Sequence, residues 1–128
     1  MTNPLQLSIL PTRLAVCRLG KSQPIPPWAT NGGFFSVTRT DDELSIVCEE
    51  AHIPPGVQVE RGWRGLKVEG PLDFSLTGIL AGLAGTLANA GISLFAISTY
   101  DTDYVLVKEP DLEKTIGALS QAGYRCNS

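Results

Sequence analysis

Five of the thirteen acidic side chains of this sequence lie in two short polar segments, residues 39–43 and 99–103, and each segment lies between two apolar stretches. The first segment carries Asp41, Asp42 and Glu43, and the second carries Asp101 and Asp103. Neighbouring carboxylates can hold a hard cation weakly or provide a counter-charge for an ammonium or guanidinium group. A solvated turn has the same composition. The pattern therefore indicates two polar turns held by strands, which are common places for binding sites.

Patterns of catalysis and metal binding are absent from the sequence. His52 is the only histidine and lies in a polar loop interrupted by proline, which predicts a solvent-exposed imidazole. No Ser–His–Asp or Cys–His arrangement can be built economically around it, and no group of His, Cys and carboxylates has zinc spacing. The glycines from Gly78 to Gly85 match neither GxGxxG nor a phosphate loop, because no Lys–Ser/Thr pair follows. We expect no enzyme, no metal and no cofactor.

The amino-acid composition limits the kinds of partner that we expect. The chain is 43% hydrophobic and 18% charged, which is ordinary for a globular protein. Its net charge is −3 and its lysines and arginines are scattered, so nucleic acid is not an expected partner. Residues 74–100 carry no charge, but polar residues and a change of period predict a buried helix and strand instead of a membrane span. With no visible signal peptide, the three cysteines are expected to be reduced in the cytoplasm.

Apolar runs between Pro, Gly and Asp residues predict short strands. They cover residues 5–10, 14–19, 34–38, 44–48, 57–61, 64–70, 94–98, 104–107 and 124–126. Helices are predicted for residues 76–90 and 110–122, whereas prolines exclude regular helices from the connections of the first half. Both faces of strands 94–98 and 104–107 are apolar, which predicts that both strands are covered on two sides.

The sequence also contains an internal repeat. At an offset of 60 residues, FFSVTRTDDELSIVCEE lies over LFAISTYDTDYVLVKEP. The identities are Phe35 with Phe95, Asp41 with Asp101, Val47 with Val107 and Glu49 with Glu109. The shared order of strand, turn and strand favours duplication over chance. We therefore predict two units, residues 1–62 and 63–128, of which the second is a full βαββαβ unit and the first has lost its helices.

Several segments resemble a known family. GILAGLAGTLANAGISLFAIST, in its βαββαβ setting, resembles the ACT domain of amino-acid sensing and allosteric proteins. GGFFSVTRTDDELSIV, GLKVEGPLDFSLTGIL and AISTYDTDYVLV resemble the small tandem-ACT proteins of bacteria, which are similar to the aspartokinase regulatory region and the CASTOR arginine sensors. The resemblance implies an α+β, ferredoxin-like fold of two tandem ACT units with antiparallel sheets, the N-terminal unit being degenerate. It also implies a homodimer without catalysis that binds an amino acid where the two units meet.

The resemblance places ligand contacts at seven positions: Ser36 and Val37 in the first hairpin, Gly78 and Ile79 at the helix start, and Thr99, Tyr100 and Asp103 in the second turn. Unpaired amides at the positive end of a helix can receive a ligand carboxylate, and the Ser36 hydroxyl can add a donor. Asp103 offers the charge opposite to an ammonium or guanidinium group. Asp101 is less suited, because it aligns with Asp41 and is therefore interpreted as structural.

Two other functions stay open at this point. The chain can be a protein–protein interaction module with a vestigial ligand site, whose unpaired strand edges dock an unknown protein. It can also be a small enzyme that uses Asp101, Asp103 or Glu69 as acid or base. The enzyme hypothesis requires two carboxylates with separated pKa values in one pocket, and the sequence gives no sign of such a pair. The sequence names neither the amino acid nor the partner.

Overall fold

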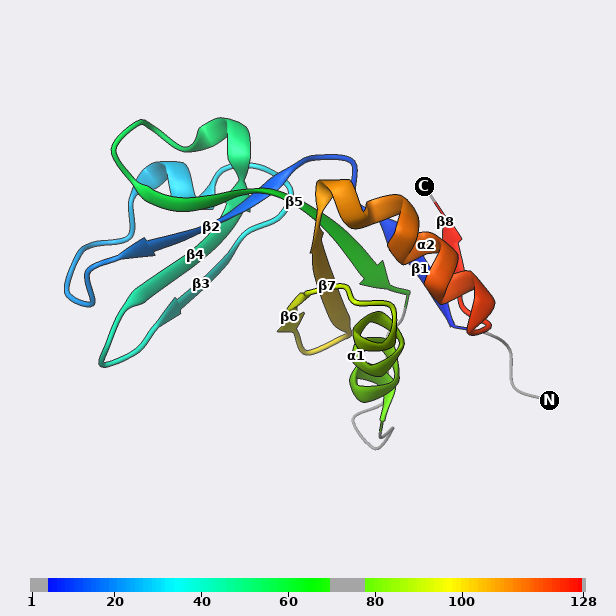
Figure 1. The fold of residues 1–128 in the computed structure, drawn as a ribbon. Helices are drawn as coiled ribbons and strands as arrows, with labels where there is room; N and C mark the ends of the chain where they lie inside the picture. The colour runs from blue at the N-terminus through cyan, green and yellow to red at the C-terminus, as the bar shows by residue number, and fades with distance from the viewer. Residues whose placement is uncertain (1–4, 70–77, 128) are drawn as a thin grey trace. The chain divides into compact units, whose positions relative to one another are not determined.

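The computed structural model describes residues 5–69 and 78–127, and the chain divides into two units (Figure 1). The small unit is Thr12–Trp63, and the large unit combines Met1–Pro11 with Arg64–Ser128. The sequence analysis divided the chain into residues 1–62 and 63–128. The first residues fall in the large unit instead of the small one, because the strand β1 (Gln6–Ile9) pairs there with two others.

The sheet of the large unit has the order β6-β7-β5-β1-β8. Its further strands are β5 (Gln58–Val68, from residue 64 on), β6 (Phe95–Ser98), β7 (Asp103–Lys108) and β8 (Arg125–Asn127). β1 runs antiparallel to β5, with Leu7 opposite Val68, and parallel to β8, with Leu7 opposite Cys126. Without β1, the remaining strands have the order of a βαββαβ unit. β1 is thus an extra strand inserted between the first and the last strand of that unit.

Two helices supply the rest of the core of the large unit. α1 (Ile79–Asn89) buries Leu83 and Leu87, and α2 (Leu112–Gln121), which follows the 3-10 turn η3 (Glu109–Asp111), buries Leu119. These leucines form one cluster with apolar residues of β5 and β7. The predicted helices are therefore confirmed within the described residues. The predicted start of the first helix, at residues 76 and 77, lies outside them.

The small unit keeps the strands of a βαββαβ unit without its helices. Its sheet has the order β3-β4-β2-β5, and each strand is antiparallel to its neighbours. The strands are β2 (Leu14–Leu19), β3 (Ser36–Arg39), β4 (Leu44–Glu49) and residues 58–63 of β5. Short 3-10 turns, η1 (Pro27–Thr30) and η2 (Glu50–His52), stand where the helices would be. The prediction of a degenerate unit without regular helices is confirmed for residues 12–63, all of which the structure describes.

β5 corrects one prediction. The sequence predicted two strands, residues 57–61 and 64–70, whereas the structure has a single strand. Gly62 lies inside it with a φ of +81°, and the pairing with β2 shifts by one residue at this point. A glycine in the left-handed conformation inserts one residue as a β-bulge without ending the strand. The glycine that indicated a break is a bulge.

The two hairpins have equivalent backbone pairing, but the offset between equivalent residues is 59 instead of 60. The turn between β3 and β4 is closed by a bond from the Thr40 amide to the Glu43 carbonyl, and the turn between β6 and β7 by the same bond from Thr99 to Thr102. The strand pairs obey the same offset, because Val37–Ile46 matches Ala96–Val105. The alignment at 60 residues, including Asp41 with Asp101, is therefore wrong by one position. It relied on a few side-chain identities, whereas backbone pairing sets the true register.

The prediction that both hairpin strands are covered on two sides holds for β7 and is wrong for β6. Val105, Leu106 and Val107 of β7 are buried in succession. β6 pairs only with β7 among the described strands, and its Ala96 and Ser98 are exposed. An edge strand with a solvated face usually carries small or polar side chains on that face. The prediction failed because alanine is small enough for this face but was counted as an apolar residue.

The three cysteines are free thiols, as expected. Cys17 and Cys48 are buried in the core of the small unit, and Cys126 is half-buried. A hydrogen bond with Cys17, followed by burial, raises the pKa of the Cys48 thiol above its usual range. This thiol therefore stays protonated and serves packing. No helix in the described part of the chain is both long and apolar enough to cross a membrane.

Candidate ligand-binding site

The turn between β6 and β7 is anchored to the end of β5. The hydroxyl of Thr102, which is only 5% exposed, donates a hydrogen bond of 2.6 Å to the carbonyl of Val68, the last residue of β5. Thr99 closes the turn from the other side, because its amide and its hydroxyl both donate to the Thr102 carbonyl, at 2.8 and 3.1 Å. The backbone that carries Tyr100 and Asp103 is thus fixed on a buried strand.

Asp103 is the first residue of β7 and lies opposite Ser98. Its Oδ1 accepts a hydrogen bond of 2.6 Å from the Ser98 hydroxyl, which orients the carboxylate. Among the ion pairs of the described residues, none involves Asp103. At the corrected offset its counterpart in the small unit is Leu44, which is fully buried. The large unit therefore has an oriented negative charge where the small unit has a core leucine.

The other two predicted contacts in this turn, Thr99 and Tyr100, differ in whether their side chains are available to a ligand. The Thr99 hydroxyl already bonds the Thr102 carbonyl, so it serves the turn itself. Tyr100 lies at the tip and is 82% exposed, the most exposed large hydrophobic side chain of the described residues. An exposed aromatic ring in the same turn as an oriented carboxylate can cover a ligand and, through its face, attract a cation.

Gly78 and Ile79 lie at the start of α1. Gly78 is the N-cap residue and has a φ of +78°, a backbone conformation that favours glycine. A Cβ added to Gly78 would meet nothing within 4 Å, so steric crowding is not the reason for glycine at this position. The first turn of α1 has no acidic residue, and Gly78 makes no side-chain cap. The first amides of a helix have no partner within the helix and lie at its positive end. This helix start can therefore accept a carboxylate.

Ser36 and Val37 are the first residues of β3, an edge strand of the small unit. Both are half-buried, and Val37 packs against the core of that unit. They thus lie in one unit, whereas the other five predicted residues lie in the other. Their contribution to a shared site stays a prediction.

Thr102 and Ser98 were missed by the sequence analysis, although one anchors the turn and the other orients Asp103. The sequence carries no signal for Thr102, because a threonine between two aspartates has the composition of a solvated turn. Ser98 had a weak signal, since it faces Asp103 in any tight pairing of the two predicted strands.

Thr102→Val should lower the free energy of unfolding by about 1–3 kcal/mol, because it leaves the buried Val68 carbonyl without its donor. Urea unfolding measures this value. Thr38→Val is the matched control, since Thr38 is exposed on β3 and the same change there should stay within about 0.5 kcal/mol. Equal stability of the two variants would contradict an anchoring role for Thr102.

The described residues contain no group of three or more His, Cys, Asp or Glu side chains that could hold a metal ion. His52 is exposed, as predicted, and its Nε2 lies 3.4 Å from Glu49 Oε1. Glu69, one of the candidate acids, accepts a hydrogen bond from the Ser8 hydroxyl and lies 4.0 Å from Lys67 Nζ. Neither of these two partners is a carboxylate.

Comparison with known proteins decides the family. The sequence profile of the ACT domain matches residues 58–121, half of the 128-residue chain. The chain belongs to the ACT-domain family. A second profile, which describes an N-terminal domain, matches residues 12–56 and so falls within the small unit of this ACT protein. The resemblance seen in the sequence is confirmed.

Relatives of this ACT protein include sensors. The human cytosolic arginine sensor for mTORC1 subunit 1 is 42% identical over 99 residues, which cover 69% of this chain and 30% of the human protein. The bovine protein of the same name is 32% identical over 99 residues, with the same coverage. The ACT chain therefore spans about a third of the length of these relatives.

Solved structures confirm the predicted fold. A protein of Agrobacterium tumefaciens is 45% identical, with a TM-score of 0.92 over 98% of this chain and 93% of that chain. The regulatory subunit of aspartate kinase from Thermus thermophilus matches with a TM-score of 0.65 over 91% of this chain and 95% of that chain. Its identity is 11%, so this likeness concerns the fold alone. The bovine and human relatives are both named as arginine sensors.

Proposed function

We propose that this ACT chain is a regulatory module that binds a free amino acid and catalyses no reaction. The observation that carries the proposal is the 42% identity with a protein named as an arginine sensor, within a stretch that covers 69% of this chain. The large unit supports it with two features of opposite charge, the start of α1 and the oriented carboxylate of Asp103.

Each feature suits one end of an amino acid. The ligand carboxylate would bind the amides at Gly78 and Ile79, where the helix dipole favours an anion. Its ammonium or guanidinium group would bind Asp103 through a charge-assisted hydrogen bond, with Tyr100 covering it. Since Asp103 is anionic and the relatives are named for arginine, basic amino acids are the first candidates. The proposal rests on the large unit, and roles for Ser36 and Val37 stay predictions.

The proposal includes a cytoplasmic homodimer. The relatives are named as cytosolic proteins, and ACT sheets offer edges for pairing. β3 and β6 each have one strand neighbour among the described residues, so each sheet has an edge that a second copy or another protein can extend. Light scattering that gives a monomer at all concentrations would remove the dimer from the proposal and leave amino acid binding untouched.

A thermal-shift screen of the twenty amino acids tests the proposed function. A ligand at a hundred times its Kd stabilises the folded state by about 2.7 kcal/mol, which raises the melting temperature of a chain this size by several degrees. We expect one amino acid, or a small set of basic ones, to give this shift. A flat panel at millimolar concentrations would contradict sensing and favour a protein-docking module with a vestigial site.

A further inference from the structure

The small unit has a cavity that none of the seven predicted ligand contacts lines. The cavity is largely open to solvent and has a volume of about 490 Å³, which is within the size range of pockets that bind small molecules. The residues that line it include Thr12, Arg13, Glu49, Glu50, Ile53 and Arg61. Every one of them belongs to the small unit. Four of the seven lining residues are charged, two with each sign.

The two carboxylates of the cavity are engaged in the fold. Glu49 Oε2 accepts a hydrogen bond of 2.7 Å from the Gly33 amide, and its Oε1 lies 3.4 Å from His52 Nε2. Glu50 Oε2 accepts a hydrogen bond of 2.9 Å from the Gly62 amide at the bulge of β5. Because these oxygens already have donors, the two glutamates serve first to hold the walls of the cavity together.

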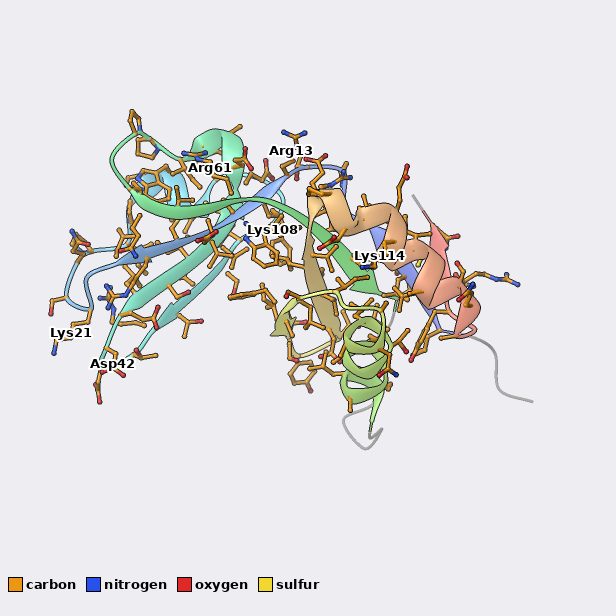
Figure 2. The ribbon with its side chains drawn as sticks, in the orientation of Figure 1. Arg13, Lys21, Asp42, Arg61, Lys108 and Lys114 are labelled. Carbon is orange, nitrogen blue, oxygen red and sulfur yellow. The ribbon has the colours of Figure 1, made fainter. Side chains whose placement is uncertain are left out.

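The two arginines are placed by the same elements. The Arg13 carbonyl accepts a hydrogen bond of 3.0 Å from the Glu50 amide, which fixes the backbone of Arg13 beside η2. Arg61 directly precedes the bulge at Gly62, and bulges re-aim the side chains next to them. Both side chains are exposed and lie on the side of the small unit where η2 lies (Figure 2). A guanidinium group has five donors, so it can keep a partner within the protein and still bind a ligand.

We propose that this cavity is a second binding site, which takes a small organic molecule through a carboxylate or phosphate group. Arg13 and Arg61 would bind the anionic oxygens, since the planar guanidinium matches both groups in a bidentate manner. Thr12, whose hydroxyl would add a donor, and the buried Ile53, which is apolar, also line the cavity. The site does not depend on the amino acid proposed for the large unit.

Calorimetric titration with two probes tests this site and distinguishes the two sources of anionic oxygens. Succinate provides carboxylates and inorganic phosphate provides the phosphate group, both at constant ionic strength set with sodium chloride. We expect saturable binding of at least one probe, with one site per chain. Arg13→Gln and Arg61→Gln should each weaken it about tenfold or more. Two variants are used so that the result does not depend on one that folds poorly.

Arg125→Gln is the matched control, because it removes the same charge from an exposed position on β8 of the large unit. Equal weakening in this control would show charge screening and overturn the proposal. So would the absence of saturable binding of either probe, or unchanged affinity in both cavity variants. Asp103→Asn should bind the probe as the unaltered chain does, so a failure of this site and a failure of the amino acid site can be told apart.

Discussion

Asp103→Asn should weaken binding of the cognate amino acid by about 10- to 150-fold and leave the fold intact. A hydrogen bond between charged groups contributes about 1.5–3 kcal/mol, which corresponds to this range of Kd. Asparagine keeps an oxygen that can accept from the Ser98 hydroxyl, so the turn retains its geometry while the negative charge is lost. Calorimetric titration with the amino acid identified in the thermal-shift screen measures the change.

Asp101→Asn is the matched control, since it removes the same charge two residues away in the same turn. Asp101 is exposed, and no hydrogen bond or ion pair described for the structure involves its side chain, so its replacement should change the Kd by less than about twofold. If the two variants weaken binding equally, the effect is a general loss of negative potential and Asp103 is not the contact. If neither changes it, the ligand binds elsewhere.

Leu87→Ala should lower the free energy of unfolding by about 2–5 kcal/mol. Leu87 is fully buried on α1 and belongs to the cluster that joins both helices to the sheet of the large unit. Removing a buried leucine side chain loses its transfer free energy and leaves a cavity. Urea unfolding should show a lower midpoint, and the slope should stay unchanged if the denatured state is unaffected.

Asn89→Ala in the last turn of the same helix controls for a change in helix propensity. Asn89 is exposed, and alanine favours the helix, so the stability should be unchanged or slightly higher. A loss of less than about 1 kcal/mol for Leu87→Ala would show that α1 is loosely packed. The start of α1 would then be a poor support for a ligand, which would weaken the proposed site as well.

The sequence was a good guide where side-chain pattern and backbone conformation agree. The four-residue spacing of Ile79, Leu83 and Leu87 predicted α1, and the glycine at position 91 has the left-handed φ expected after a helix. The apolar stretches around the two aspartate turns predicted both hairpins. In each of these cases the local signal is strong enough to be read without knowledge of the rest of the chain.

The errors arose where pairing between distant segments decides the structure. The offset of the repeat was wrong by one residue because four side-chain identities were weighed without the strand register. β1 was assigned to the first unit because its pairing with β5 and β8 has no local signature. The bulge at Gly62 was taken for a break for the same reason.

The seven candidate site residues stay predictions. Asp103 stays a predicted ligand contact. In the corrected alignment of the two hairpins its counterpart is the buried Leu44, so this position is charged in the large unit only. Asp101 is no longer interpreted as structural, because that interpretation depended on its alignment with Asp41, which the strand register does not support. No sequence pattern indicated the anchoring role of Thr102, because this role is a single buried hydrogen bond to a strand that is distant in the sequence.

The central claim is that the large unit binds an amino acid at the start of α1 and the turn between β6 and β7. Titration of the ¹⁵N-labelled chain with the amino acids, observed by amide NMR, tests it most directly. The account predicts saturable shifts of the Ile79 amide and of the amides of residues 99–103, all with one Kd, for at least one amino acid. Saturable shifts confined to other residues, or none with any of the twenty, would contradict it.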